Sequence, residues 1–250
     1  MIDVPVGAVL TVRAQQTCTA HPSVDVSIDQ VVDKQSDGVP FDVRTVCELI
    51  EGLLGMTDST QGWCRLILAR HGETVLNADG RLRGHLDPEL DSTGLRQVAA
   101  LAAALTRYDV RVVRHSPLQR ARQTAEAIAS AAGVTAQADA LLMDRDYGEW
   151  AGHRKSDVVG QWGSVDDAPG VEPAAAVLDR ALQTLQKYAD VPGVVLVAHD
   201  AVNQVLLSHL DPAHGAPPRQ RTACWNVLEH NPSGGWRVVE VDLVAPADRS

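Results

Sequence analysis

Aromatic residues are scarce in this chain of 250 residues. Phe, Trp and Tyr make up 4% of the sequence, whereas hydrophobic residues as a class reach 45%. The core therefore has to be built mainly from Val, Leu, Ala and Ile. Charged residues contribute 22%, an ordinary share for a globular protein. The length suits one large α/β domain, or one domain with a small appendage.

Cysteines are few, and long apolar runs are missing. Cys18, Cys47, Cys64 and Cys224 are scattered without a CxxC pair, a pattern that predicts neither a zinc site nor a disulfide framework. No apolar run approaches the roughly 20 residues that span a bilayer. The start of the chain lacks the charged residues and the apolar run of a signal peptide. We therefore expect reduced thiols in a cytoplasmic protein without a membrane partner.

The formal net charge is −10 at pH 7, which disfavours broad binding to nucleic acids. An acidic surface around a small basic cleft would suit an enzyme that handles small anions. The sequence contains no HExxH motif, no GxxxxGKS/T motif and no cluster of carboxylates. It therefore predicts neither a metal-dependent hydrolase nor an ATPase.

Residues 1–62 differ in pattern from the rest of the chain. Val-rich and Ile-rich stretches predict short strands at 7–13 and 24–32, and helical spacing of apolar residues predicts a helix over 43–54. Residues 56–62 resemble a linker. We recognise no motif in this N-terminal segment, so three roles stay open for it: covering the main domain, forming a homodimer, or binding a ligand.

From residue 65 onward, strands and helices alternate. Ser116 as the cap, Pro117 at the first position and Gly133 at the end predict one helix. This order implies a mainly parallel central sheet with helices on both faces, in a three-layer α/β/α domain over 63–250. The other expected elements are strands at 66–69, 110–113, 134–137 and 194–198, helices at 92–107, 173–189 and 201–210, and closing edge strands at 224–229 and 236–241.

Two expected strands end in histidine. The first leads into Arg70 and His71, and the second leads into His199 and Asp200. Ligands and substrates in open α/β sheets bind beyond the carboxyl ends of the strands, so both imidazoles should face one crevice. Cys64 and Arg70 also have the Cys-x5-Arg spacing of cysteine-dependent phosphatases. We reject that interpretation because the residues between them form a strand without glycine, not a phosphate-binding loop.

The run Arg70-His71-Gly72-Glu73-Thr74 resembles the signature of the histidine phosphatase superfamily, also called the phosphoglycerate mutase-like family. Further matches follow in the order that the family has, and the resemblance covers residues 65 to about 210. These matches are Asn77, Arg83-Gly84-His85-Leu86-Asp87 with Leu90 and Gly94, Ser116-Pro117-Leu118-Gln119-Arg120-Ala121-Arg122-Gln123-Thr124-Ala125, Asp144-Arg145-Asp146-Tyr147-Gly148-Glu149-Trp150-Ala151-Gly152, and His199.

The chemistry of phosphate esters explains these residue types. The ester oxygens repel nucleophiles, and guanidinium groups offset that charge by binding phosphate oxygens in a two-pronged fashion. A neutral imidazole is a good nucleophile near pH 7 and needs no metal and no cofactor. The resemblance implies that His71 becomes a phosphohistidine, that Arg70, Arg120 and His199 hold the phosphoryl oxygens, and that Asn77 lines the same pocket.

The general acid is where this sequence departs from the family. Many relatives carry Glu four residues before the glycine that is Gly148 here, and this chain has Asp144 at that position. We assign Asp144 as the acid that protonates the leaving group, with Asp146 and Glu149 as alternatives. A second departure is Asp200, because glycine usually follows the second histidine. Its carboxylate either lies near the phosphate pocket, where it would lower affinity for highly anionic substrates, or points away.

Other polar residues have simpler interpretations. Arg81, Arg83 and Arg122 are solvated charges in the simplest view, with Arg83 also a candidate substrate-binding residue. His85 is ambiguous because it lies in the second loop. Substrate specificity is expected from the loops at 76–90 and 151–171. Trp150 and Trp162 in or beside the second loop would stack on a leaving group or, more simply, pack in the core.

We therefore expect a phosphatase that hydrolyses phosphate monoesters of small metabolites. One alternative is a mutase of the phosphoglycerate mutase type. Family mutases have a longer stretch between the acid and the second histidine, whereas residues 149–198 here are expected to be largely one helix. The other alternative is a non-catalytic phospholigand-binding protein, and the presence of His71, His199 and a candidate acid argues against it.

Overall fold

The computed structural model describes residues 63–215 and 217–246. The strands and the helix expected within residues 1–62 lie outside this part, as do Cys18 and Cys47. Cys64 and Cys224 are free thiols. No helix in the described part is long and apolar enough to cross a membrane.

The described residues form a six-stranded sheet with the order β3-β2-β4-β1-β5-β6. The prediction of a mainly parallel sheet is confirmed, because the first four of these strands run parallel and β5 and β6 are antiparallel. The strands are β1 (Cys64–Arg70), β2 (Val112–His115), β3 (Ala136–Ala138), β4 (Val194–Ala198), β5 (Trp225–Asn231) and β6 (Gly235–Leu243).

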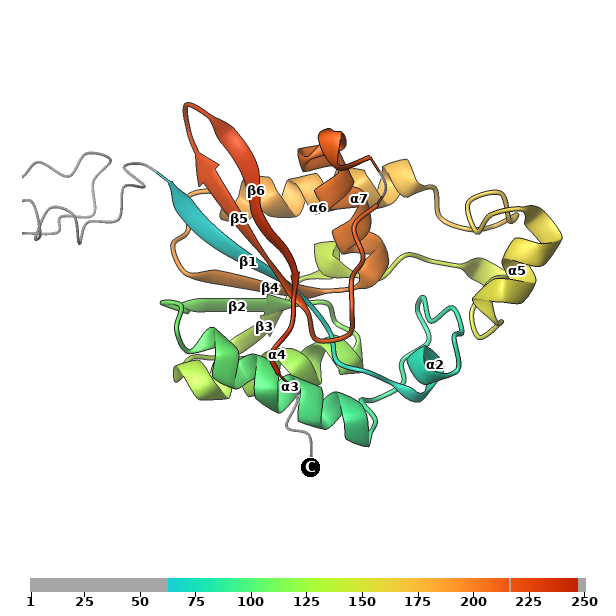
Figure 1. Cartoon of the computed structure of the whole chain (residues 1–250), viewed down its shortest axis with the longest axis horizontal. Helices are drawn as coiled ribbons and strands as arrows, with labels where there is room; N and C mark the ends of the chain where they lie inside the picture. Colours follow the sequence, from blue (N-terminus) through green and yellow to red (C-terminus); the bar gives the residue numbers. More distant parts are fainter. Residues whose placement is uncertain (1–62, 216, 247–250) are drawn as a thin grey trace, which may run out of the picture. The chain divides into compact units, whose positions relative to one another are not determined.

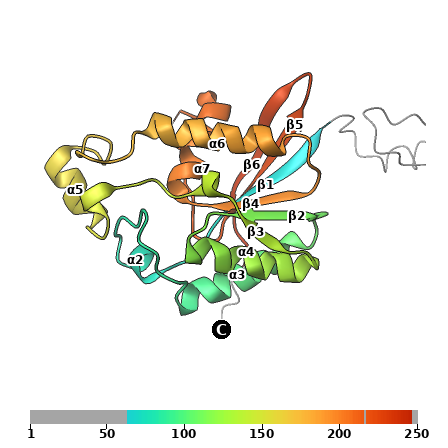
Figure 2. The ribbon, with the colours of Figure 1, turned by 180° about the vertical axis from the view of Figure 1, so that it is seen from behind.

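Helices cover both faces of the sheet, which confirms the expected three layers (Figures 1 and 2). On one face, α3 (Ser92–Leu105) and α4 (Gln119–Ala132) pack against the sheet, where Ile67 and Val197 join their core. On the other face, α6 (Ala174–Tyr188) and α7 (Asp200–Leu210) pack on a core that includes Leu66 and Leu196. Successive residues of β1 and β4 thus serve opposite cores, as the pleat of a strand requires.

Three strand predictions need correction. Strand β2 begins at Val112 because the backbone N–H groups of Arg111 and Val112 both donate to the Gly193 carbonyl before the ladder starts. Strand β3 likewise begins two residues after its predicted start, at Ala136. Strand β5 was expected at an edge, yet it lies between β1 and β6. Its first five residues are buried, which fits an interior strand, and β6 forms the edge.

The start of α4 was also predicted wrongly. The helix begins at Gln119 with Leu118 at its cap position, and no side chain caps it. Ser116 instead extends the sheet, because its backbone N–H donates to the Val197 carbonyl at 3.0 Å. The end of the helix is as expected, since Gly133 closes it in the left-handed region with φ of 70°.

The remaining elements are short. Helices α2 (Val75–Ala78) and α5 (Lys155–Trp162) were not predicted, so the stretch between the candidate acid and the second histidine contains two helices where one was expected. Three 3-10 turns complete the described part: η1 (Ala140–Leu142), η2 (Gly148–Trp150) and η3 (Pro212–His214). Helices α2 and α5 lie beyond the carboxyl ends of the parallel strands (Figure 1).

Candidate active site

The two strand-end histidines lie side by side. Strands β1 and β4 are parallel neighbours, with Arg70 opposite Ala198. His71 follows the first strand and His199 follows the second, so both lie at the same edge of the sheet. Their ring centroids are 5.1 Å apart, and the rings are tilted by 58°. Both side chains are fully buried. The structure therefore brings together the two imidazoles that the sequence placed at one crevice.

The hydrogen bonds of His71 define which nitrogen is free to react. Its Nδ1 lies 2.6 Å from the Gly72 carbonyl oxygen, which accepts only if Nδ1 carries the proton. The lone pair is then on Nε2, which accepts from Arg120 Nε at 3.3 Å. Burial, together with the charges of Arg120, Arg70 and Arg83, holds the pKa of His71 well below its usual value. The result is a neutral imidazole with a nucleophilic Nε2.

Arg120 connects His71 to the candidate acid, Asp144. It lies in the first turn of α4 and is fully buried. Its guanidinium donates to Asp144 Oδ2 at 2.8 Å and to the carbonyls of Gly84 and Leu86 at 2.9 and 2.7 Å. A buried cation is costly unless such partners surround it. The loop at 84–86 and the Asp144 segment are thus tied to the start of α4.

Asp144 is fully buried beside the second histidine. Its Oδ2 lies 3.6 Å from His199 Nδ1, and its Oδ1 accepts from the backbone N–H of Arg145 at 2.9 Å. Burial raises the pKa of Asp144, the nearby Asp200 charge adds to this, and the Arg120 charge opposes it without cancelling it. The two alternatives are more exposed: Asp146 has 51% of its side chain accessible, and Glu149 lies at the surface.

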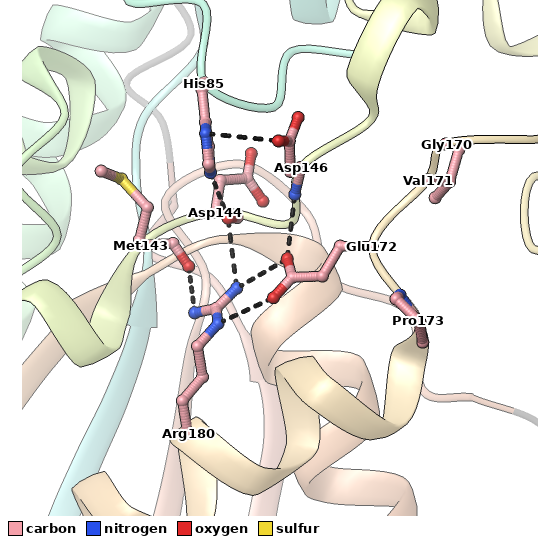
Figure 3. Close-up of a pocket in the computed structure, with 9 residues that line it drawn as sticks. All are labelled: His85, Met143, Asp144, Asp146, Gly170, Val171, Glu172, Pro173 and Arg180. Carbon is pink, nitrogen blue, oxygen red and sulfur yellow. Dashed lines mark hydrogen bonds and ion pairs between the residues drawn. The ribbon is translucent and has the colours of Figure 1, made fainter.

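A cavity of about 500 Å³ adjoins Asp144 (Figure 3). Arg180 lies at its base, where the guanidinium pairs with Glu172 and also donates to the backbone carbonyls of Met143 and Asp144. His85 and Asp146 lie opposite, 3.9 Å apart. The Arg180 contacts fix the backbone that carries Asp144. Among the described residues of the buried cluster, Asp144 is the one that lines this cavity, and its side chain is fully buried.

Arg83 is not the solvated charge of the simplest interpretation. Only 8% of the residue is exposed, and its Nη2 donates to Asp200 Oδ1 at 2.6 Å. Arg70 has its Nη2 3.5 Å from Asp200 Oδ2, while its Nη1 donates to the Gln220 carbonyl at 2.5 Å. Asp200 therefore points into the site and bridges the two guanidinium groups. By contrast, Arg122 is half exposed and pairs with Glu126 on the surface of α4.

Several buried polar atoms of the described site have no hydrogen-bond partner. They are Nε of Arg70, Nε of Arg83 and both ring nitrogens of His199. The two arginine Nε atoms are donors, and a neutral His199 offers one donor and one acceptor, so this set can bind a ligand that has acceptor oxygens. In the described part of the chain, no group of three or more His, Cys, Asp or Glu side chains is arranged to hold a metal ion.

Asn77 lies at the edge of a second cavity. Its Oδ1 accepts from the Thr74 backbone and hydroxyl at 3.1 and 2.8 Å, and this caps α2. The cavity of about 750 Å³ is lined by Asn77, Arg70, Arg83 and the segment that contains Arg219 and Gln220. Sequence reasoning missed these last two residues, because they lie beyond the recognised motifs and reach the site through the turn before β5.

The comparisons with known proteins now identify the family. Residues 66–243 match the sequence profile of the histidine phosphatase superfamily (branch 1), and the chain belongs to this family. The match extends past residue 210, where the recognised motifs end, and includes β5 and β6.

The individual relatives share less than a third of their aligned residues with this chain. A glucosyl-3-phosphoglycerate phosphatase of Mycolicibacterium vanbaalenii is 31% identical over 166 residues, which cover 58% of this chain and 73% of that protein. A bifunctional protein of Mycobacterium tuberculosis is 31% identical over 156 residues, 59% of this chain, and the match spans 42% of that longer protein. The solved structure of a mycobacterial hydrolase superposes with a TM-score of 0.65 at 27% identity and covers 73% of this chain and 100% of that one.

Proposed function

We propose that this protein is a phosphatase that hydrolyses phosphate monoesters of small molecules through a phosphohistidine on His71. The observation that carries the proposal is the neutral His71 imidazole, whose Nε2 faces the Arg120 guanidinium at 3.3 Å in a buried site with further unpaired cationic donors. A phosphoryl group needs both components, a nucleophile with a free lone pair and cations that offset the charge of its oxygens.

The first step transfers the phosphoryl group to the enzyme. His71 Nε2 forms a bond to phosphorus while the bond from phosphorus to the ester oxygen breaks. Arg70, Arg83, Arg120 and His199 hold the phosphoryl oxygens. The departing ester oxygen takes a proton from Asp144, and burial raises the pKa of this carboxyl group.

The second step releases phosphate. The Asp144 carboxylate accepts a proton from a water molecule as the water oxygen bonds to phosphorus. The bond from phosphorus to Nε2 breaks, and His71 returns to its neutral state with its Nδ1 proton still donated to Gly72. Asp144 is protonated again, so both groups are ready for another cycle. Neither step calls for a metal ion.

The relatives and the cavities support a substrate class. A relative that covers 58% of this chain is a glucosyl-3-phosphoglycerate phosphatase, which supports a small phosphorylated metabolite as the substrate here. The cavity of about 500 Å³ beside Asp144 has the size of a small-molecule site. We place the catalytic function in residues 63–250, with Asn77 at the rim, and we infer a cytoplasmic location from the free thiols.

The test is to capture the phosphorylated enzyme. Wild-type protein mixed with p-nitrophenyl [³²P]phosphate and quenched rapidly should carry label that is stable to base and labile to acid, and turnover should persist in EDTA. His71→Asn should lose label and lower kcat by more than about 10³-fold. His115→Asn is the matched control, because His115 is also buried at a strand end with its Nδ1 2.7 Å from a carbonyl oxygen. Full turnover by His71→Asn would exclude this mechanism.

A further inference from the structure

Asp200 is bound to the same guanidinium atoms that a phosphate would use. The Nε and Nη2 atoms of an arginine form one edge of the guanidinium, and this edge can bind two oxygens of a phosphate. In both Arg70 and Arg83, Nη2 is next to an Asp200 oxygen, at 3.5 and 2.6 Å. In both, Nε is buried and has no partner. On each edge, therefore, one nitrogen lies next to the carboxylate and the other has no hydrogen-bond partner.

The position of Asp200 places it on the solvent side of the reacting groups. His71, His199, Arg120 and Asp144 are fully buried, whereas 26% of the Asp200 side chain is exposed. The bridge between Asp200 and the two arginines is therefore the part of this cluster nearest to solvent. To bind both arginine edges in full, a phosphoryl group has to take the places of the Asp200 oxygens.

The carboxylate is held in this place by several forces. Burial disfavours its charge, but the Arg70 and Arg83 guanidiniums outweigh that cost and hold the pKa of Asp200 well below its usual value. Asp200 is also the first residue of α7, where the helix dipole favours a negative charge. Asp200 is therefore ionised at every pH at which the enzyme would work, and it offsets one positive charge of the site.

We propose that the Asp200 carboxylate is an internal competitor for the phosphoryl group, which must displace it from Arg70 and Arg83 in order to bind. This inference rests on the proposed function of the same site and assigns Asp200 as a residue that sets affinity. The competition weakens binding of every oxyanion, including the inorganic phosphate product, and so favours substrates whose uncharged part contributes much of the binding. Rapid release of phosphate is the expected benefit.

Inorganic phosphate is the probe that tests this proposal in the full chain. Its Kd is measured by calorimetry, and its Ki is measured against p-nitrophenyl phosphate. Asp200→Asn and Asp200→Ser both remove the charge, and the two new side chains differ in shape. Each should lower Kd and Ki together by about tenfold, which corresponds to about 1.4 kcal/mol. Asp200→Glu keeps the charge, so its phosphate affinity should stay within about twofold of the wild-type value.

Glu126→Gln is the matched control for net charge, because Glu126 is also paired with an arginine but is exposed on α4. Its Kd for phosphate should equal that of the wild type. Unchanged or weaker phosphate binding in both Asp200→Asn and Asp200→Ser overturns the proposal and would make Asp200 a residue that merely orients the arginines. If the wild type has no phosphatase activity while the neutral variants still bind phosphate more tightly, the proposed function fails and the competition stands.

Discussion

Burial acts on the residues of this site in opposite ways according to their charge. A desolvated imidazole and a desolvated carboxyl group both avoid the charged form. The pKa of His71 is therefore lowered, and the pKa of Asp144 is raised. One buried pocket thus shifts both pKa values toward the neutral forms, the direction that the two proposed steps need. Asp200, at the rim, escapes this effect because two arginines compensate its charge.

Asp144 is the residue whose proposed role is most sharply testable. Asp144→Asn keeps the size of the side chain but removes the acidic proton. Loss of a general acid costs typically about 10²–10⁴-fold in rate. An aliphatic alkoxide needs the proton far more than p-nitrophenolate does. The variant should therefore lose most of its kcat on glycerol phosphate and much less on p-nitrophenyl phosphate. Because the protonated form is active, the wild-type rate should fall as pH rises through the Asp144 pKa, and the variant should lack this fall.

Asp146→Asn and Glu149→Gln are the controls for this experiment, since both side chains are partly or fully exposed and neither is in the buried cluster. In both variants, the ratio of kcat on glycerol phosphate to kcat on p-nitrophenyl phosphate should equal that of the wild type. If Asp146→Asn alone shows the loss that depends on the leaving group, the acid has been assigned two residues too early. Equal losses in all three variants on both substrates would mean that this loop has a structural role and that the proton comes from another group.

Site residues that lie within local motifs could be predicted from the sequence. Contacts between residues that are far apart in the sequence could not. His71 and His199 follow apolar strands, so their position at one sheet edge was predictable. The pair of Arg83 and Asp200 spans 117 positions in the chain. No periodicity relates two such residues, and Arg83 alone resembles any surface arginine. The contact depends on the tertiary fold, which brings the loop before α3 to the start of α7.

At the scale of elements, helix α3 approaches the loop that carries His71 very closely. A Cβ atom on Gly94 would lie 2.1 Å from the Glu73 carbonyl oxygen, and a Cβ on Gly72 would lie 2.8 Å from the Gly94 oxygen. The backbone N–H of Gly94 also donates to Asp91, the cap of α3. These two glycines allow the helix start to rest directly on the loop and so fix the direction in which His71 leaves β1.

Gly94→Ala should therefore force the His71 loop and α3 apart. We expect the free energy of unfolding, measured with urea, to fall by about 1–3 kcal/mol, the usual cost of overpacking, and kcat/KM to fall with it. Gly160→Ala is the matched control, because Gly160 lies in α5 and its added Cβ would meet no atom within 4 Å. That change should raise stability by about 0.5–1 kcal/mol. A Gly94→Ala protein as stable and active as the wild type would refute the close-packing argument.

Elements with strong apolar periodicity were predicted well, and weakly patterned ones were not. Helix α6 and strand β4 agree with their expected positions to within one residue because their buried residues recur at helical spacing or form an unbroken run. Helix α5 was missed, since Val158 is its one buried residue and no apolar stripe marks it. The start of α4 was placed too early because Ser116 and Pro117 form a good cap signal, whereas the competing hydrogen bond to β4 is visible only in the fold.

For the whole molecule, we expect the two buried histidines to lower the free energy of unfolding at acidic pH. His71 and His199 are both fully buried with pKa values held well below the usual value, first by burial and then by the charge of Arg120. In the unfolded chain, both would titrate near pH 6.5. Between that pH and their folded pKa values, the unfolded state binds more protons than the native state. The free energy of unfolding should therefore decrease as pH falls below about 6.5.

Each histidine should contribute a slope of up to about 1.4 kcal/mol per pH unit in this range. Asp144 acts in the opposite sense, because its raised pKa lets the native state take up a proton first, so it reduces the net slope. The measurement is urea unfolding of the full chain at pH 7.5, 6.5 and 5.5. His71→Asn and His199→Asn should each flatten the dependence on pH, and the double variant should flatten it most. A wild-type protein that is equally stable at pH 5.5 and 7.5, or variants that keep its slope, would show that these imidazoles are not held neutral, and the proposed nucleophile would lose its physical basis.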